Sequence, residues 1–312
     1  MIRAPLPLLP LPLGAIRSFS EVKQQVIVRV PASTSNLGPG FDCLGIALRL
    51  YNVITVRRGE HTRLTPMMRN AANKFFAAAN CRGFDFSCEV DGAIPISRGL
   101  GSSAVIRLGL MHAINELLGS NFSRTDLFAL SAALEGHPEN AAAASFGGLN
   151  VVRGVETQRF EIRPELQFVL LVPDFEIETE KSRRLLPGEI PRADAVMSAG
   201  NAAFIVAAFA SADYEKLRGA FRDGLHQQYR RKLVPFLDDV IGSAENAGAL
   251  GAFLSGSGSS ICAVTLHDPE KVARAMQASA RVQTTRVIMT KADNRGVRLL
   301  KSASRLRQSQ LK

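Results

Sequence analysis

The sequence predicts an α+β protein of two lobes, and three observations support this fold class. The chain has 312 residues, more than a single domain commonly contains. Its helical and strand patterns mix without the repeated strand–helix–strand spacing of a doubly wound sheet. Two turns rich in glycine and serine, within 97–104 and 255–260, fall one in each expected lobe. We therefore predict two lobes that meet at a cleft.

The lobe boundaries follow from changes in composition along the chain. Residues 1–20 carry four prolines, which break the apolar helix that a signal peptide needs, so we expect a disordered extension or a misassigned start there. We assign 21–165 to the first lobe and 166–312 to the second. The end of the chain is rich in Lys and Arg, and we expect it to form a solvated basic tail.

In the first lobe, the residues from Gln25 predict a strand, then a loop rich in Ser, Gly and Pro, then a second strand at 52–56. A short helix is expected at 66–80 and another strand at 84–90. An almost wholly apolar helix follows the turn at 97–101 and should end at Gly119. Such a helix must be buried.

In the second lobe, the apolar segment 168–173 (FVLLVP) predicts a central strand. Helical patterns cover 193–210 and 214–225, and another lies near 238–249. Residues 251–266 then predict a strand, a Gly/Ser turn and a second strand.

The segment Gly99–Ala104 predicts an anion site at the start of the apolar helix. A helix N-terminus presents unpaired backbone N–H groups and the positive end of the helix dipole. Gly99 and Gly101 let the backbone approach a phosphate, and Ser102 and Ser103 can cap the helix, donate hydroxyls or hold a metal through water. The Gly-Lys-Ser/Thr ending of a P-loop is absent. A plain capped helix after a tight turn is the alternative interpretation.

A second Gly/Ser segment, Ser255–Ser260, lies between two apolar strands. A tight hairpin turn would explain this segment equally well. Two such loops in two lobes nevertheless suggest a clamp around one ligand.

Two groups of polar residues add candidate chemistry. Asn36 and Asp42 flank a Gly-Pro-Gly turn, where they either face a cleft or brace the turn. The second group places two carboxylates, an imidazole and an amide within six residues: Glu135, His137, Glu139 and Asn140. Magnesium prefers oxygen ligands, so Glu135 is a candidate metal ligand, whereas a lone His137 is more typical of a hydrogen-bonding residue.

Charge and cysteine content restrict the class of protein. The net charge of +10 suits an anionic ligand such as a nucleotide, but also RNA or an acidic surface. The four cysteines form no CxxC pair, which predicts neither a zinc site nor a disulfide framework and favours reduced thiols in a cytoplasmic protein. No run of about 18 apolar residues occurs, so we expect no membrane span.

Three segments, in their order and spacing, resemble the three motifs of the GHMP kinases: Val30–Gly45 (VPASTSNLGPGFDCLG), Pro95–Ala104 (PISRGLGSSA) and Gly251–Ser260 (GAFLSGSGSS). Within that superfamily, three further segments resemble the homoserine kinases: Glu135–Asn140 (EGHPEN), Val172–Pro187 (VPDFEIETEKSRRLLP) and Asp223–Arg230 (DGLHQQYR). The similarity covers most of the chain, from Val26 to Val287.

The resemblance implies a two-lobed GHMP kinase fold, with an N-terminal lobe like the second domain of ribosomal protein S5 and a ferredoxin-like C-terminal lobe. It also implies that ATP binds in a syn conformation against the loop that precedes the apolar helix, and that Mg²⁺ is held by Ser103 and Glu135. The implied ATP-binding residues are Pro95, Ile96, Ser97, Arg98, Gly99, Leu100, Gly101, Ser102, Ser103, Ala104, Gly256 and Gly258.

The resemblance further implies that the acceptor is L-homoserine, whose hydroxyl receives the phosphoryl group. The implied substrate-binding residues are Asn36, Asp42, His137, Glu139, Thr179, Arg183 and Arg230. The two arginines suit a carboxylate because a guanidinium can contact both of its oxygens. Asp42 and Asn140 are the implied catalytic residues, and we assign Asp42 to orienting the hydroxyl, since homoserine kinases are thought to work without a strong base. The expected partners are these small molecules and a second copy of the chain, with no nucleic acid and no membrane.

The chain departs from the family pattern at four positions. Glu139 stands where the family has Asp, and it reaches one methylene further toward the ammonium group of the substrate. Gln228 replaces a Pro, and Ser257 and Ser259 replace an Ala and a Pro. The region between 56 and 84 contains no evident counterpart of the family's adenine-contacting Asn-Leu stretch.

Two alternative functions stay open. The first is a GHMP kinase for another small alcohol, such as a mevalonate or a sugar, against which Arg183 and Thr179 argue. The second is a non-catalytic nucleotide- or RNA-binding protein on the same fold. Such a protein is expected to interleave aromatic and basic residues, yet the chain has no Trp and only three Tyr.

Overall fold

The computed structural model describes residues 23–59, 63–280 and 284–304, with side chains described as far as residue 300. The predicted extension at 1–20 and the last residues of the predicted tail lie outside this part of the chain.

The first lobe is built on a long antiparallel hairpin of β1 (Lys23–Asn36) and β2 (Gly40–Arg58). Its sheet runs in the order β10-β1-β2-β4-β5, and β3 also pairs with β2. The other strands are β3 (Phe86–Gly92), β4 (Leu149–Arg153), β5 (Glu156–Phe160) and β10 (Arg298–Ser304). Alternate residues of β1, including Val26, Val28 and Val30, are buried, as expected for a strand with one face on the core.

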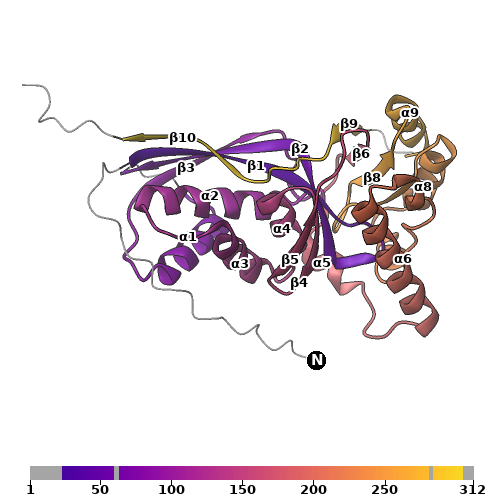
Figure 1. Cartoon of the computed structure of the whole chain (residues 1–312), viewed down its shortest axis with the longest axis horizontal. Coiled ribbons are helices and arrows are strands. Elements are labelled where there is room, and N and C mark those ends of the chain that lie inside the picture. The colour runs from indigo at the N-terminus through magenta and orange to yellow at the C-terminus, as the bar shows by residue number, and fades with distance from the viewer. Residues whose placement is uncertain (1–22, 60–62, 281–283, 305–312) are drawn as a thin grey trace, which may run out of the picture.

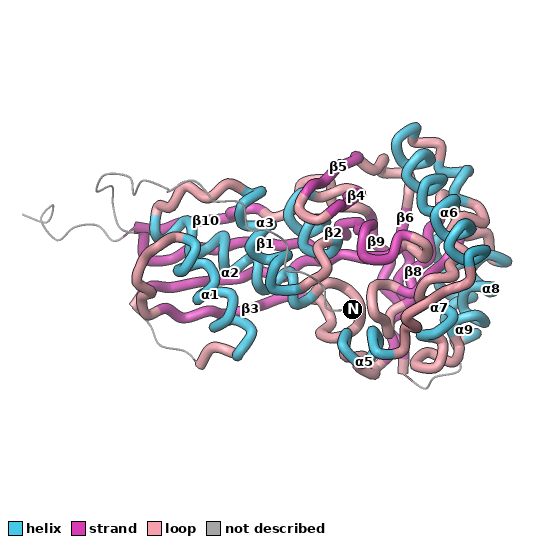
Figure 2. The backbone as a smooth tube through the Cα atoms, turned by 90° about the horizontal axis from the view of Figure 1, so that it is seen from below, coloured by secondary structure: helices cyan, strands magenta, loops and turns pink. Residues whose placement is uncertain are grey.

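Helices cover one face of this sheet (Figure 1). They are α1 (Pro66–Ala78), α2 (Ser102–Leu118), α3 (Arg124–Glu135) and α4 (Glu139–Phe146). Figure 2 views the lobe from the helical side, with α1, α2 and α3 in front of the strands. The apolar helix α2 is buried as predicted, because Val105, Leu108 and Met111 have no exposed surface.

The hairpin differs from the sequence prediction of a long loop followed by a strand at 52–56. The two strands pair almost to their tip, which leaves only residues 37–39 as the turn. Ser33, Thr34 and Ser35 were weak strand signals, but they are buried and lie in the ladder opposite β2. At the tip, Asn36 and Asp42 have positive φ angles of 72° and 59°, a conformation that Asn and Asp tolerate better than most residues.

The second lobe has a four-stranded antiparallel sheet in the order β7-β8-β6-β9. Its elements are β6 (Gln167–Pro173), α5 (Thr179–Arg184), α6 (Arg192–Ser211), η1 (Tyr214–Leu217), α7 (Gln227–Arg230), α8 (Leu237–Asn246), β7 (Gly251–Leu254), β8 (Ile261–Thr265), α9 (Pro269–Ser279) and β9 (Thr285–Lys291). The first and third strands lie in the centre, which is the ferredoxin-like arrangement. The predicted helix at 214–225 is limited to the short η1.

The central strand β6 joins the two lobes into one body. Phe168 and Leu170 belong to a core cluster that contains residues of both lobes, whereas Val169 and Leu171 pack with α8 and α9. Successive residues of a strand point to opposite faces, so a strand buried on both sides must be apolar throughout. The FVLLVP segment has this composition. The two-lobed α+β fold predicted from the sequence is confirmed.

The C-terminal strand corrects the predicted lobe boundary. β10 pairs with β1, with Leu299 opposite Val28 and Arg298 opposite Arg29, so residues 298–304 complete the first-lobe sheet. Arg29 and Arg298 lie over the ring of Tyr51 at 4.8 and 5.6 Å. The basic composition suggested a solvated tail, but a strand edge needs backbone hydrogen bonds, and the edge of β1 supplies them.

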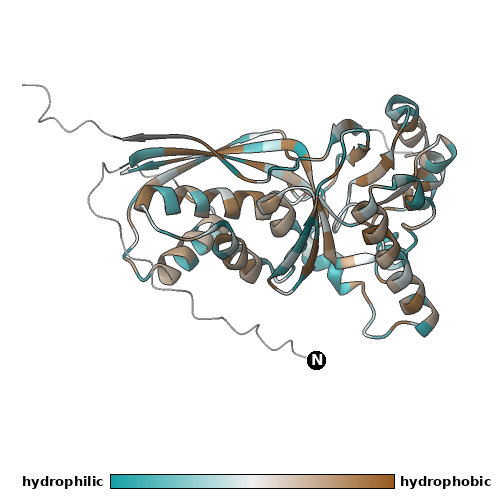
Figure 3. Cartoon of the chain, viewed as in Figure 1, coloured by the Kyte–Doolittle hydropathy of each residue, from teal (hydrophilic) through white to brown (hydrophobic). Residues whose placement is uncertain are grey.

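By length and apolar composition, one described helix, α6, could span a bilayer. Only 22% of its apolar window is buried in the protein, and the buried residues include Ile205, Ala208 and Phe209. Its outer face carries Val196 and Phe204, which are 66% and 53% exposed. Figure 3 shows the hydrophobic colouring of this helix.

Candidate active site

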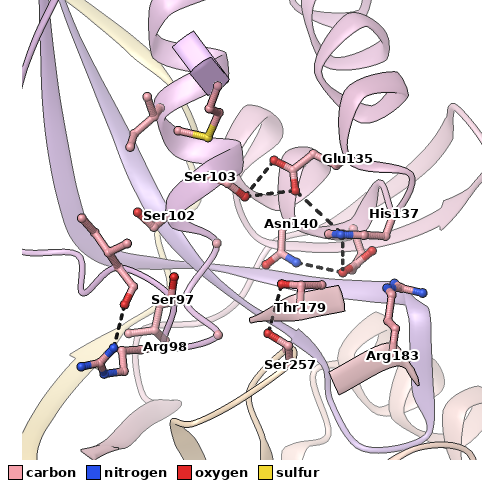
Figure 4. A pocket seen from close by; sticks show the side chains of 18 of the residues that line it. Ser97, Arg98, Ser102, Ser103, Glu135, His137, Asn140, Thr179, Arg183 and Ser257 are labelled. Carbon is pink, nitrogen blue, oxygen red and sulfur yellow. Dashed lines mark hydrogen bonds and ion pairs between the residues drawn. The ribbon is translucent and has the colours of Figure 1, made fainter. Parts of the chain in front are cut away.

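A cavity of about 580 Å³ lies where the two lobes meet. Its walls come from the hairpin tip, the start of α1, the loop before α2, the α3–α4 connection, α5, α7 and the loop after β7. Figure 4 shows polar side chains from both lobes pointing into this space. A cavity of this size can hold a nucleotide-sized ligand.

The structure brings most of the predicted site residues to this one cavity. They are Asn36, Asp42, Ile96, Ser97, Arg98, Gly99, Leu100, Gly101, Ser102, Ser103, Glu135, His137, Glu139, Asn140, Thr179, Arg183, Arg230 and Gly256. Pro95, Ala104 and Gly258 do not line it. Ala104 is fully buried in α2, and a side chain at Gly258 would contact Leu254 and Ile177 behind the loop.

The two Gly/Ser turns are in direct contact. Ser255 Oγ donates to Gly99 O at 2.7 Å, and the backbone N–H of Ser260 donates to Arg98 O at 3.2 Å. The approach needs glycine, because a Cβ at Gly99 would lie 2.0 Å from Ser255 O. The second turn therefore packs behind the first and holds it in place.

The start of α2 is open for an anion. Its N-cap is Gly101, which has no side chain to occupy the first N–H groups and has a φ of 69°. The sequence suggested that serines cap the helix. Ser102 and Ser103 instead lie inside its first turn, and both line the cavity. Helix N–H groups that face a cavity are well suited to phosphate oxygens.

The Arg98 guanidinium contacts backbone carbonyl oxygens and a carboxylate of the protein itself. Its guanidinium donates to Pro173 O at 3.0 Å and to Ile96 O at 3.1 Å, and it lies 3.3 Å from a carboxylate oxygen of Glu176. These contacts tie the loop of the first lobe to the end of β6. Arg98 nevertheless lines the cavity, and its contact with ATP stays a prediction.

Glu135 and Ser103 form the candidate metal site. Ser103 Oγ donates to Glu135 Oε1 at 3.0 Å, and Arg107, one turn further along α2, makes an ion pair with the same carboxylate. Among the described residues, no group of three or more His, Cys, Asp or Glu side chains could hold a metal. One carboxylate and one hydroxyl suit Mg²⁺ that keeps phosphate and water ligands, so these residues fit a metal delivered with a nucleotide.

Buried Glu139 and partly buried His137 form a polar pair beside the hairpin tip. Burial, reinforced by nearby Asp42, raises the pKa of Glu139 to about 7. Burial lowers the pKa of His137. Among the described residues, Glu139 Oε2 and His137 Nδ1 have no hydrogen-bond partner, although both atoms are buried. Unsatisfied buried polar atoms in a cavity wall indicate a ligand that would complete them.

Asn140 is held rigidly by β1. Its Oδ1 accepts from Ser33 Oγ at 2.8 Å, and its Nδ2 donates to Ser35 Oγ at 3.0 Å and to Glu139 Oε1 at 2.8 Å. The serines that the sequence placed in a loop thus orient a predicted catalytic residue.

Two arginines from the second lobe surround an aromatic ring. The Cζ atoms of Arg183 and Arg230 lie 5.3 and 5.2 Å from the centre of the Phe41 ring. Both Nε atoms are buried without a partner among the described residues. Thr179 lies close by, with its hydroxyl 3.4 Å from Ser257 Oγ. The pair of guanidinium groups leaves donors for a carboxylate.

The sequence did not reveal every wall residue. Phe41 and Ser257 lie inside recognised motifs but were not selected, and Ile106 was assigned only to the helix interior. Residues 65–68 (TPMM) at the start of α1 also line the cavity. They lie in the region 56–84, in which the sequence showed no counterpart of the adenine-contacting stretch. The available signal was the Thr-Pro pair, typical of a helix start, since Thr65 Oγ1 accepts from the Met68 N–H.

Comparison with known proteins identifies the family of the chain. The model of the GHMP kinases N terminal domain matches residues 66–148, and that of the GHMP kinases C terminal domain matches 205–282. Homoserine kinase from Clostridium botulinum (strain Alaska E43 / Type E3) is 36% identical over 296 residues, which cover 88% of this chain and 98% of that protein.

Solved structures give the same result. The crystal structure of homoserine kinase from Cytophaga hutchinsonii ATCC 33406 matches with a TM-score of 0.81 and 25% identity, covering 91% of this chain and all of the other. Methanococcus jannaschii mevalonate kinase, at 15% identity and a TM-score of 0.64, shares the fold, and the alignment covers 89% of this chain and 99% of that one. The predicted resemblance is confirmed: the chain belongs to the homoserine kinase family of the GHMP kinases.

Proposed function

We propose that this protein is a homoserine kinase, which transfers the terminal phosphoryl group of ATP to the side-chain hydroxyl of L-homoserine in threonine biosynthesis. The observation that carries this proposal is the meeting, in one cavity, of an open helix N-terminus for phosphate with two arginines for a carboxylate. The family membership of the chain supports it.

The phosphate end of the reaction is assigned to the start of α2. The backbone N–H groups after Gly101 receive the phosphate oxygens, and Ser103 and Glu135 hold Mg²⁺. When bound, Mg²⁺ neutralises charge on the phosphoryl oxygens. Residues 65–68 and Ile106 supply an apolar wall for the base.

The acceptor end is assigned to the hairpin tip, α5 and α7. Arg183 and Arg230 bind the carboxylate, Glu139 binds the ammonium group, and Asn36 and Asp42 orient the hydroxyl. The hydroxyl oxygen forms a bond to the terminal phosphorus, the bond from that phosphorus to the bridging oxygen breaks, and ADP leaves. Both oxygens of Asp42 are engaged by Arg183, which suits orientation of the hydroxyl better than proton abstraction.

The rate enhancement is expected to come mainly from alignment and charge neutralisation. Asn140, whose side chain is held by Ser33 and Ser35, aligns the two substrates where they meet. The hydroxyl proton passes to solvent or to a phosphate oxygen, so no strongly basic residue is required.

A coupled assay of ADP release with homoserine, mevalonate and galactose tests the acceptor. Turnover with homoserine alone is expected, and ³¹P NMR should show a new phosphomonoester signal. Turnover with another alcohol and none with homoserine would refute the proposal, and salt-sensitive RNA binding without ATP turnover would favour the non-catalytic alternative.

The proposed working form is a cytoplasmic homodimer. The cysteines of the described part of the chain are free thiols. Exposed Val196, Met197 and Phe204 on α6 provide an apolar surface that a second subunit could cover. Light scattering should give a dimeric mass, and Phe204→Glu should shift it toward the monomer.

A further inference from the structure

His226 is a fully buried histidine outside the cavity wall. It precedes α7 and belongs to the DGLHQQYR segment, in which only Arg230 had a predicted role. Its Nε2 lies 2.9 Å from the carbonyl oxygen of Gly38, which is 188 residues away at the hairpin tip of the other lobe. The side chain therefore connects the second lobe to the turn that carries the proposed acceptor site.

The partners of His226 define its protonation. Its Nδ1 lies 3.2 Å from Arg230 Nη1, and a guanidinium only donates hydrogen bonds, so Nδ1 must accept. The proton is consequently on Nε2, which donates to Gly38 O. Asp223 Oδ2 lies 3.5 Å from Nε2, but that carboxylate already accepts from the N–H groups of residues 225–227. Burial also lowers the pKa of His226 to about 4.

Arg230 extends the contact to the second Gly/Ser turn. The same Nη1 donates to Gly256 O at 3.0 Å, and this carbonyl also accepts from Asn36 Nδ2 at 3.0 Å. Asn36 Oδ1 in turn accepts from the Asp42 N–H at 3.1 Å. Together with the backbone of residues 36–38, these hydrogen bonds close a circuit through the hairpin tip, α7 and the loop after β7.

The ring of Phe41 covers this circuit. It lies 5.2 Å from the His226 ring with an angle of 30° between their planes, and Arg230 Cζ lies 5.2 Å from it. The Arg230 guanidinium is thereby fixed on one side by an aromatic face and at Nη1 by two acceptors. Its Nε has no partner among the described residues, although it is buried.

We propose that His226 is a positioning residue, which as a neutral Nε2–H tautomer sets Arg230 and the hairpin tip at the correct separation for the acceptor substrate. The proposal rests on the proposed function, in which Arg230 binds the acceptor carboxylate. His226 touches neither substrate. Its loss should weaken acceptor binding because Arg230 would lose an acceptor and Gly38 a donor at the same time.

The test compares steady-state kinetics of two variants with the wild type. His226→Phe keeps a ring against Phe41 but removes both hydrogen bonds, and His226→Asn stays polar but is too short to meet both partners. In each, KM for homoserine should rise about tenfold or more, the range expected for loss of a hydrogen bond to a charged group, while KM for ATP stays within about twofold. Isothermal titration with homoserine should show the same loss.

A matched control is His112→Phe, which replaces a partly buried histidine on α2, away from the cavity. It should leave both KM values unchanged. An unchanged homoserine KM in either folded His226 variant, or equal increases for ATP and homoserine, would overturn the proposal. Absence of homoserine turnover in the wild type would instead refute the proposed function.

Discussion

Arg183 and Asp42, 141 residues apart in the chain, form a two-point ion pair across the candidate active site, with Arg183 Nη1 3.0 Å from Asp42 Oδ2. The pair ties α5 of the second lobe to the hairpin tip of the first. In the proposed mechanism, an acceptor carboxylate bound to Arg183 would share this guanidinium with Asp42, which would couple acceptor binding to hydroxyl orientation.

Replacement of Arg183 by Lys should impair acceptor binding. Lysine keeps the charge but cannot make the planar two-point contact, so KM for homoserine should rise about tenfold. The control is Arg184→Lys, because Arg184 is 71% exposed and pairs with Glu180 on the same helix. Steady-state kinetics with saturating ATP measure both. Equal effects of the two substitutions would show that Arg183 has no special role.

Asp42→Asn tests the orienting role. The amide retains the shape but loses the charge that pairs with Arg183, and we expect kcat to fall about 10- to 100-fold, less than for loss of an essential base in many enzymes. Single-turnover kinetics separate this effect from substrate binding. Normal binding of both substrates with full turnover would contradict the assignment.

Glu139 should make acceptor binding depend on pH. Its pKa is raised to about 7, so the carboxyl is largely neutral at pH 6 and charged at pH 8, and only the charged form attracts an ammonium group. KM for homoserine should fall about tenfold over this interval. In Glu139→Gln the dependence should disappear, and a variant that keeps the full pH profile would assign it to another group.

The same carboxyl should make the folded protein less stable as pH rises, although the rise in pH improves acceptor binding. The folded protein holds the Glu139 proton more tightly than the unfolded chain, whose ordinary pKa is about 4.5. Between pH 4.5 and 7 its contribution to the free energy of unfolding should therefore decrease as pH rises. Denaturant unfolding of the wild type and Glu139→Gln across this range measures the difference.

Gly99→Ala should disrupt the contact between the two Gly/Ser turns. The new Cβ would lie 2.0 Å from Ser255 O, and the positive φ of 73° adds backbone strain. Gly119→Ala is a matched control, because its φ is 63° but no atom lies within 4 Å of the added Cβ. Both variants should lose about 1 kcal/mol of stability from strain. Only Gly99→Ala should also raise KM for ATP, and similar kinetics in both would contradict the packing argument.

Asp293→Asn tests how the C-terminal strand is attached. Asp293 accepts from Arg298 Nη2 at 2.6 Å, from Tyr51 Oη at 2.8 Å and from the N–H groups of Arg295 and Gly296 at 2.8 and 2.7 Å. Because the carboxylate is buried, its loss should lower the free energy of unfolding by about 1 to 3 kcal/mol. Glu89→Gln on β3, which breaks an ion pair whose Glu side chain is 60% exposed, should have no measurable effect. Thermal unfolding compares the two.

The sequence predicted those helices, strands and turns that depend on the composition of their own residues. The apolar composition of 102–118 required a buried helix, FVLLVP required a strand covered on both faces, and the Gly-rich turns marked close backbone approach. Ser33 and Ser35 carried no comparable signal. They form strand because β2 lies opposite them, and their hydroxyls find a partner in Asn140.

By itself, the sequence determined the fold class, the family and the residue types available for phosphate and carboxylate binding, because these depend on short patterns and motif order. Only the tertiary structure decided that Arg183 pairs with Asp42, that Arg107 pairs with Glu135, that His226 supports Arg230, and that the last strand returns to the first lobe. Each of these depends on which distant segments share a surface. Position along the chain does not reveal which distant segments come into contact, whereas the packing of the two lobes determines it.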